Sequence, residues 1–458
     1  MKIAVIGGGP GGYVAALKAA MMGAEVTLIE KNKVGGTCLN VGCIPTKSLL
    51  ACSEAFDFIK EAENFGLKSD INAEADLAKI NSRKNKIVDN LVKGIEFLLE
   101  SRNVNLVNGF GKLITKNQIS VTMDDGSEQI VDADKIILAT GSKAIVPGMF
   151  KYDKKNVLTS DETLELTEIP KSLLIVGGGV IGCEFGQFFS KLGTKVTIVE
   201  MASHVLPFED DDVAKQLTRA FKKQKIKIIA KDKVDSVEVN DGSVKVVLGS
   251  GKEIEAQKML VSVGRRANTE NLGLEALNVQ LDRGKVVVNE KMQTNIDNIY
   301  AIGDIVDSPL LAHVASKEAL IAVENALGKV NEISYKAVPR CVYTSPEVAA
   351  VGMTQKQLDE QGIEYKIGMF DFRGLGKAQA TSKIQGFVKI IVDKDEKIIG
   401  ASIVGAHATD LLAELTLAVH FGLTAKQLGD VIHPHPTMSE AIMEAAHAVE
   451  GKCVHAVD

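Results

Sequence analysis

The chain contains many short apolar runs, and several of them are followed by glycine. Residues 3–17 carry no charge, but five of these fifteen residues are glycine, which favours a strand and a turn over a membrane helix. Residues 387–404 contain the apolar runs FVKIIV and KIIGASIV on either side of a charged turn, which predicts a β-hairpin. Apolar residues between 411 and 419 recur at helical spacing and predict a helix that faces a core.

One segment of the chain occurs twice. Residues 3–30 and 173–200 align without a gap at an offset of 170. Each copy is an apolar run, a glycine turn, a helix-length stretch and a second apolar run that ends in an acid. The matching positions are Gly7, Gly9, Gly12 and Glu30 in the first copy, and Gly177, Gly179, Gly182 and Glu200 in the second.

The repeated pattern is the dinucleotide-binding βαβ fingerprint. Its first glycine permits a tight turn, its second lets backbone N–H groups approach a pyrophosphate, and its third lets helix and strand pack closely. The acid accepts hydrogen bonds from the adenosine ribose. No Arg or Lys stands in residues 200–204, and Glu200 would repel a 2′-phosphate, so the second site favours NAD over NADP. The sequence thus predicts an α/β protein with two Rossmann-like dinucleotide-binding domains.

Length and composition narrow the class further. A chain of 458 residues is typical of about three domains. A net charge of −6 and no uninterrupted apolar stretch of membrane-spanning length argue against nucleic-acid and membrane partners. Six cysteines are too sparse for a secreted disulfide scaffold, which favours a cytoplasmic location. The charge runs at residues 209–212 and 222–233 predict solvated faces.

Two cysteines lie close together in the segment GGTCLNVGCIPTK, residues 35–47. Metal ligands, inert core cysteines and a redox disulfide are the possible interpretations of Cys38 and Cys43. Their spacing of four intervening residues is at the upper limit of zinc sites, and no second ligand cluster follows, so no metal site is expected. On a regular helix their Cα atoms would lie about 8.6 Å apart, beyond the roughly 7 Å that a disulfide spans. A bridge therefore requires a distorted helix, which Gly42 and Pro45 would allow.

A second candidate for chemistry is the proline-bounded segment HPHPTMSE, residues 433–440. His433 and His435 could ligate a metal, although no further ligands accompany them, or could be ordinary loop residues. Thr437 and Glu440 also fit a helix capping box ahead of the apolar run at 441–449. That interpretation explains Glu440 without any catalysis.

Taken together, the two fingerprints and the C-x4-C pair resemble the flavoprotein disulfide reductases, a family of pyridine nucleotide–disulfide oxidoreductases. The resemblance implies that the first site holds FAD and the second NAD. It implies that Cys38 exchanges with the substrate and that Cys43 contacts the flavin. It also implies that His435, oriented by Glu440, is the acid–base group and reaches the cysteines from the partner subunit of a homodimer, while His433 carries no chemistry.

Further positions match residues that surround the cofactors in this family. Lys47 matches the lysine near the reactive flavin nitrogens, and Glu184 matches the carboxylate that pairs with it. The other expected FAD contacts are Gly111, Thr140, Gly141, Ser142, Asp304, Leu310, Leu311, Ala312 and His313. The other expected NAD contacts are Val234 and Gly264.

The resemblance also implies a domain division and a reaction. We expect an FAD domain at 1–142, an NAD domain at 143–262, a return segment of the FAD domain at 263–335, and an α+β dimerisation domain at 336–458. The cysteine segment is similar to that of members that oxidise protein-bound dihydrolipoamide with NAD⁺. Lipoylated proteins of 2-oxoacid dehydrogenase or glycine-cleavage complexes are then the expected partners.

Rival reactions within the family have recognisable sequence features. Members that reduce glutathione or trypanothione carry two lysines after the cysteine–proline, where this chain has Thr46 and Lys47. Mercuric reductases carry a cysteine pair at the C-terminus, where this chain has only Cys453, which we interpret as incidental.

Overall fold

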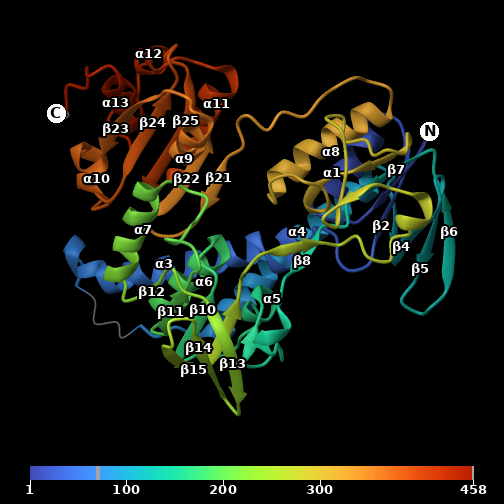
Figure 1. The fold of residues 1–458 in the computed structure, drawn as a ribbon, viewed down its shortest axis with the longest axis horizontal. Coiled ribbons are helices and arrows are strands. Elements are labelled where there is room, and N and C mark those ends of the chain that lie inside the picture. Colours follow the sequence, from blue (N-terminus) through green and yellow to red (C-terminus); the bar gives the residue numbers. More distant parts are fainter. Residues whose placement is uncertain (69–72, 456–458) are drawn as a thin grey trace.

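A computed structural model describes residues 1–68 and 73–455. The chain forms three lobes (Figure 1): a first lobe around β1, a second around β10, and a third that contains the C-terminal sheet. The first lobe lies at the right of the view, the second at the bottom and the third at the upper left.

A five-stranded parallel sheet forms the centre of the first lobe. Its order is β20 (Ile299–Ala301), β7 (Lys135–Leu138), β1 (Lys2–Ile6), β2 (Glu25–Glu30) and β3 (Asn105–Asn108). On one face α1 (Pro10–Met21) packs against α8 (Ala312–Ala326). Because β20 pairs with β7, the chain returns to this sheet after it has built the second lobe.

The second lobe repeats the same architecture. Its parallel sheet has the order β12 (Lys227–Ile229), β11 (Lys195–Val199), β10 (Ser172–Val176), β16 (Lys258–Val261) and β9 (Val157–Leu158). The second copy of the sequence repeat forms β10, α6 (Val180–Lys191) and β11, as the first copy forms β1, α1 and β2. The predicted pair of Rossmann-like units is confirmed.

A small antiparallel sheet accompanies each of the two parallel sheets. In the first lobe it contains β4 (Phe110–Thr115), β5 (Gln118–Thr122) and β6 (Glu128–Asp132). In the second lobe it contains β13 (Val234–Asn240), β14 (Ser243–Leu248) and β15 (Glu253–Ala256).

The third lobe is an antiparallel sheet with helices on it. The order is β21 (Arg340–Val342), β22 (Glu347–Gly352), β25 (Ile398–Gly405), β24 (Phe387–Val392) and β23 (Lys366–Asp371). The helix α11 (Ala408–Phe421) packs on β22 and β25, and α13 (Glu440–Val449) packs on β23 and β24. The predicted hairpin is β24 with β25, and the predicted helix is α11, so both are confirmed.

Two structural features connect the first lobe with the second. The helix α3 (Cys43–Glu61) packs against α4 (Leu77–Ser101) and against α6 of the second lobe. The crossover strands β8 (Ser142–Ala144) and β17 (Arg265–Ala267) pair antiparallel where the chain leaves the first lobe and comes back. These connections bring the cysteine segment, both glycine turns and the third lobe toward one region.

Within the acidic run at residues 209–212, Asp210 is buried and the side chain of Glu209 is only 9% exposed, whereas Asp211 is exposed. The prediction of a solvated face is therefore wrong for Glu209 and Asp210. Arg340 donates two hydrogen bonds to the carboxylate of Glu209, at 2.8 and 3.1 Å. The Nζ atom of Lys389, whose side chain is 0% exposed, lies 2.8 Å from Asp210 and 2.7 Å from Asp212. Arg340 and Lys389 lie in the sheet of the third lobe, far along the chain, and no pattern near residues 209–212 indicates that they will bind there. The acidic run therefore joins the second lobe to the third.

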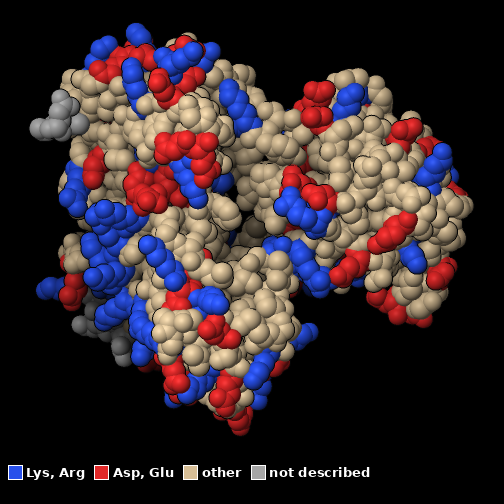
Figure 2. Space-filling view, viewed as in Figure 1, with Lys and Arg blue, Asp and Glu red and all other residues tan. Residues whose placement is uncertain are grey.

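The basic residues that follow are solvated, as predicted. The helix α7 (Asp211–Lys223) buries Val213, Leu217 and Phe221, while Lys222 and Lys223 are exposed. Figure 2 shows acidic and basic side chains interspersed over most of the visible face, with basic side chains gathered where α7 lies. Within the described residues, no helix is long and apolar enough to cross a membrane.

Candidate active site

Cys38 and Cys43 lie on either side of a break between two helices. The helix α2 (Gly36–Val41) ends at Gly42, and α3 begins at Cys43. A Cβ atom on Gly42 would lie 2.8 Å from the carbonyl oxygen of Thr37 and 3.3 Å from the Cα atom of Cys38. Only glycine allows the two helices to approach this closely, and the predicted distortion of the helix between the cysteines is confirmed.

The two thiols are free in this structure, and they differ in acidity. The hydrogen bond that Cys38 donates to Cys43, helped by the charge of Lys47, lowers the pKa of Cys43 to about 7. The same hydrogen bond, together with burial, raises the pKa of Cys38. Near neutral pH the pair therefore holds its proton on Cys38 and its negative charge on Cys43.

An ion pair lies beside the thiolate. The Nζ atom of Lys47, on α3, is 2.8 and 3.0 Å from the two carboxylate oxygens of Glu184, on α6. Glu184 is 3% exposed and also accepts a hydrogen bond from the backbone N–H of Tyr343, at 3.0 Å. The ring of Tyr343 faces Lys47, whose Nζ atom lies 4.4 Å from the ring centroid. The predicted pair of Lys47 and Glu184 is thus a direct contact that joins the first two lobes.

The cysteine segment begins against the first glycine turn. The backbone N–H of Gly35 donates to the carbonyl oxygen of Gly8 at 2.8 Å, and a Cβ atom on Gly36 would lie 2.5 Å from the Cα atom of Gly9. The redox pair is thereby fixed to the same turn that the sequence assigns to FAD.

Both glycine turns have the form of a phosphate cradle. A Cβ atom on Gly7 or Gly177 would lie 2.2 or 2.3 Å from a carbonyl oxygen of the neighbouring strand end. A Cβ atom on Gly12 or Gly182 would lie 1.7 or 2.0 Å from a carbonyl oxygen of its own turn. Gly179, in contrast, has nothing within 4 Å of that position, and Gly9 meets only Gly36, at 3.8 Å. The first and third glycines serve packing, while the second leaves room in front of the helix N-terminus, which suits a pyrophosphate.

The two acids of the repeat occupy equivalent places. Glu30 accepts hydrogen bonds from the N–H groups of Gly8 and Asn32, at 2.6 and 2.8 Å. Glu200 accepts from Gly178 and Ala202 at the same two distances. Each carboxylate braces its glycine turn and keeps lone pairs for ribose hydroxyls. The residues present therefore fit a dinucleotide at both sites.

Further expected FAD residues meet where β8 follows β7. The hydroxyl of Ser142 donates to Asp304, and Arg265 donates to the hydroxyl and the carbonyl oxygen of Ser142 at 2.7 and 2.8 Å. The hydroxyl of Thr140 donates to the carbonyl oxygen of Asn268 at 2.7 Å, which holds the crossover strands together around Gly141.

The other expected cofactor residues are spread around the two turns. Gly111 lies in β4, where a Cβ atom would meet the side chains of Ile6 and Ile29, at 3.1 and 3.2 Å. Leu310 and Leu311 precede α8, which begins at Ala312, and His313 binds the carbonyl oxygen of Pro339 at 3.0 Å. The side chain of Val234 belongs to the core of the second lobe. Gly264 has a φ of +127° beside the crossover strand β17.

His435 and Glu440 form a pair in the third lobe. The Nδ1 atom of His435 lies 2.9 Å from Oε1 of Glu440, whose Oε2 accepts from the N–H of Thr437 at 2.9 Å. Partial burial raises the pKa of Glu440, but these two hydrogen bonds outweigh it and hold that pKa below its usual value. The imidazole is 75% exposed. Within the described residues, no hydrogen bond joins it to the cysteines of its own chain.

The predicted capping box at Thr437 is only half present, and the prediction is corrected here. The helix α13 has its N-cap at Ser439, and the hydroxyl of Thr437 donates to the carbonyl oxygen of Pro434 instead of capping the helix. Glu440 reaches back to the backbone, as in a capping box, but gives its other oxygen to His435. His433 is buried against Glu414 at 2.9 Å, which is a structural role.

Sequence reasoning missed three residues of this region. Tyr343 contacts both members of the lysine–glutamate pair, and Arg265 binds Ser142. Glu318, which is fully buried, accepts hydrogen bonds from the N–H of Gly303 at 2.6 Å and from Tyr335. Burial raises the pKa of Glu318 in spite of these two hydrogen bonds. The position of Arg265 directly after Gly264 was the one available signal, because the others depend on long-range folding.

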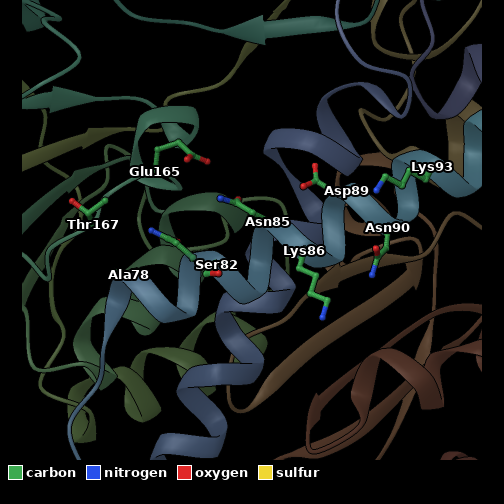
Figure 3. Close-up of a pocket in the computed structure, with 10 residues that line it drawn as sticks. Ala78, Ser82, Asn85, Lys86, Asp89, Asn90, Lys93, Glu165 and Thr167 are labelled. Carbon is green, nitrogen blue, oxygen red and sulfur yellow. The ribbon is translucent and has the colours of Figure 1, made fainter.

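A surface pocket of about 690 Å³ lies elsewhere, along α4. Figure 3 shows Ser82, Asn85 and Asp89 on this helix, with Glu165 and Thr167 across the opening. No predicted site residue lines the pocket. No group of three or more His, Cys, Asp or Glu side chains in the described ranges is arranged to hold a metal ion.

Comparisons with known proteins agree with this geometry. Residues 1–319 match the pyridine nucleotide-disulphide oxidoreductase family, and residues 338–446 match the dimerisation domain of that family. The chain therefore belongs to the pyridine nucleotide-disulphide oxidoreductases. The prediction of a disulfide oxidoreductase that uses FAD and NAD is confirmed.

Individual relatives resemble the chain over its whole length. It is 42% identical to the mitochondrial dihydrolipoyl dehydrogenase of Pisum sativum, covering 99% of this chain and 92% of the relative. It is 40% identical to the dihydrolipoyl dehydrogenase of Bacillus subtilis, covering 99% and 98%. The crystal structure of LpdA from Mycobacterium tuberculosis superposes with a TM-score of 0.92 at 31% identity, covering 98% and 99%.

Proposed function

We propose that the protein is a dihydrolipoyl dehydrogenase, which oxidises protein-bound dihydrolipoamide to lipoamide and reduces NAD⁺ to NADH. One observation carries the proposal: Cys38 and Cys43 flank the helix break at Gly42, where a hydrogen bond from Cys38 and the charge of Lys47 lower the pKa of Cys43. Such a pair suits exchange with a dithiol, because a thiolate with a lowered pKa is a good leaving group. The relatives named dihydrolipoyl dehydrogenase support this choice of substrate.

The cysteine and histidine residues perform the sulfur chemistry. His435 accepts a proton from one substrate thiol, and the resulting thiolate attacks the Sγ atom of Cys38 in the oxidised pair. A substrate–Cys38 bond forms, the Cys38–Cys43 bond breaks, and Cys43 leaves as a thiolate. The second substrate thiol then attacks the substrate sulfur bound to Cys38, closes the cyclic disulfide and passes its proton to Cys38. The substrate has lost two electrons and two protons, which the protein now holds.

Residues around the pair keep these charges in place. Glu440 fixes the tautomer of His435, so that Nε2 is the atom that takes the proton, and stabilises the imidazolium that forms. Lys47 stabilises the thiolate of Cys43. When bound, FAD supplies the electron transfer from this thiolate to NAD⁺.

His435 has to come from a second copy of the chain under this proposal. Its imidazole is exposed in the third lobe, and residues 338–446 match a dimerisation domain. A homodimer in which each subunit lends His435 and Glu440 to the other completes two equal sites.

The remaining cofactor assignments are part of the proposal. FAD contacts Gly7, Gly9, Gly12, Glu30, Lys47, Gly111, Thr140, Gly141, Ser142, Asp304 and residues 310–313. NAD contacts Gly177, Gly179, Gly182, Glu184, Glu200, Val234 and Gly264. The open space at Gly179 suits a pyrophosphate, and the absence of Arg or Lys in residues 200–204 supports NAD over NADP.

The domain limits and the partners are likewise proposed. Residues 1–142 and 263–335 make the FAD domain, residues 143–262 the NAD domain and residues 336–458 the dimerisation domain. Lipoylated proteins of 2-oxoacid dehydrogenase or glycine-cleavage complexes are the proposed partners. We propose a cytoplasmic location, which fits the sparse cysteines.

A substrate comparison tests the proposal. The purified flavoprotein should form NADH from dihydrolipoamide and NAD⁺, and anaerobic dihydrolipoamide should produce a long-wavelength thiolate–flavin absorption band. Cys43→Ser should abolish both the band and the turnover. Turnover with NADPH and glutathione disulfide in place of these substrates, or a band that survives in Cys43→Ser, would overturn the assignment.

A further inference from the structure

The ring and the backbone of Tyr343 touch different members of the Lys47–Glu184 pair. Tyr343 follows β21 of the third lobe, and its N–H donates to Glu184 of the second lobe at 3.0 Å. Its ring meets the ammonium of Lys47, on α3, with 4.4 Å between Nζ and the ring centroid. One residue of the third lobe thus meets a side chain from each of the other two lobes.

The backbone of this segment is fixed by the second lobe. Two residues after Tyr343, the N–H of Ser345 donates to the side chain of Gln187 at 2.7 Å. The carbonyl oxygen of Ser345 accepts from Gln187 and from Gln224, both at 2.8 Å. Because Glu184 and Gln187 lie on the same face of α6 and are both buried, they hold the backbone of residues 343–345 against this helix.

The phenol hydroxyl is not the part of Tyr343 that acts on Lys47. Burial, with smaller contributions from nearby negative groups, raises the pKa of Tyr343 to about 12, so the side chain stays neutral at working pH. A neutral aromatic ring attracts a cation through its face, and Phe would serve as well as Tyr in this respect.

Two electrostatic effects make the position of Lys47 matter for Cys43. Cys43 faces Cys38, Lys47 and Glu184, and also influences the phenol of Tyr343. Lys47 lowers the pKa of Cys43, whereas Glu184 raises it. If the ammonium moved away, the thiolate would lose its cation and would face an uncompensated carboxylate. Both changes would raise the pKa of Cys43.

We propose that Tyr343 is a positioning residue: its ring face and its backbone N–H hold Lys47 and Glu184 so that the ammonium stays beside the thiolate of Cys43. This inference rests on the proposed function only in that the proposed reaction uses the Cys43 thiolate. The contacts themselves do not depend on which dithiol is oxidised.

The pH dependence of alkylation tests the proposal. The flavoprotein is reduced with dithiothreitol, exchanged into anaerobic buffers and treated with iodoacetamide between pH 5 and 10, and labelling of Cys43 is quantified by mass spectrometry. We expect Tyr343→Phe to keep the wild-type midpoint. We expect Tyr343→Leu to raise it by about 0.5 pH units, the shift equivalent to losing a cation–π contact at a partly exposed site.

A double-mutant comparison excludes a merely structural effect. Lys47→Met should raise the midpoint by more than Tyr343→Leu, and adding Tyr343→Leu to Lys47→Met should then change nothing further. If Tyr343→Leu does not fold, Tyr343→Met, which is unbranched and of similar size, takes its place.

The outcomes separate this inference from the proposed function. Equal midpoints for Tyr343→Leu and the wild type, or a shift in Tyr343→Phe as large as in Tyr343→Leu, would overturn the positioning role. Failure of the wild type to oxidise dihydrolipoamide would instead overturn the proposed function and leave the alkylation midpoints to be judged separately.

Discussion

Replacing Gly42 by alanine should disturb the redox pair without touching either thiol. The new Cβ atom would lie 2.8 Å from the carbonyl oxygen of Thr37 and 3.3 Å from the Cα atom of Cys38. An ordinary contact begins at 3.4 Å, so the end of α2 would have to move away from α3 by roughly 0.6 Å. The obstacle is backbone, which no side-chain rotation can relieve.

The size of the effect follows from two opposing contributions. Overpacking of this kind costs about 1–3 kcal/mol, whereas the loss of glycine's freedom in the unfolded chain returns about 0.4–1 kcal/mol. A net local loss of about 1–2 kcal/mol corresponds to roughly 5- to 30-fold more frequent opening of the segment.

Hydrogen exchange measures this opening directly. Peptides that contain the amides of Leu39 and Thr46, which bond to Gly35 and Gly42, should exchange roughly 5- to 30-fold faster in Gly42→Ala. Turnover should fall at the same time, because the two thiols lose their alignment.

A matched variant controls for the substitution itself. Gly94 lies within α4 and has nothing within 4 Å of its Cβ position, so Gly94→Ala should stabilise its helix by about 0.5–1 kcal/mol and leave residues 37–46 unchanged. Wild-type exchange and turnover in Gly42→Ala would refute the reasoning that the glycine is needed for the close approach of the helices.

Four further predictions follow from the geometry. Glu440→Gln should lower kcat roughly 100-fold, because the imidazolium of His435 loses its charged partner; a change below threefold across the pH range would contradict this role. Alkylation of Cys43 should have a midpoint near pH 7 and should fall about tenfold per pH unit below it, because protonation removes the thiolate; a midpoint near 9 would contradict the assignment. Lys389→Met should destabilise the fold by about 3–5 kcal/mol in denaturant titrations, because Asp210 is left buried without its cation, and adding Asp210→Asn should recover part of the loss. Ile432→Asp, at a side chain that is 95% exposed in the single chain, should yield inactive monomers in sedimentation experiments, whereas Val330→Asp, at a similarly exposed site of the first lobe, should leave the dimer intact.

The parts of the molecule that sequence could predict are those encoded in short segments. The two βαβ units each occupy one continuous stretch, and their glycines and acids have fixed local tasks. One example is Gly12, where a Cβ atom would lie 1.7 Å from the carbonyl oxygen of Gly7. The break between the cysteines also has a local cause in Gly42. The hairpin β24–β25 follows from two apolar runs on either side of a charged turn, and the helix α11 follows from apolar residues at helical spacing.

The parts that escaped prediction depend on residues that are far apart in the chain. Nothing near Glu209 or Asp210 indicates that Arg340 and Lys389 will bury them. Tyr343 reaches Lys47 only because α6 anchors its segment. The capping box at Thr437 was a reasonable local interpretation, but one carboxylate oxygen of Glu440 binds the imidazole of His435, and the N-cap is Ser439, two residues after Thr437.

The buried charges between the second and third lobes have a consequence for motion in a dimer. Arg340 binds Glu209, and Lys389 binds Asp210 and Asp212. A tilt of the second lobe against the C-terminal sheet would break these ion pairs and leave Lys389 and Asp210 buried without partners, which is costly. If two C-terminal sheets form the centre of a dimer, the two second lobes become rigid extensions of that centre.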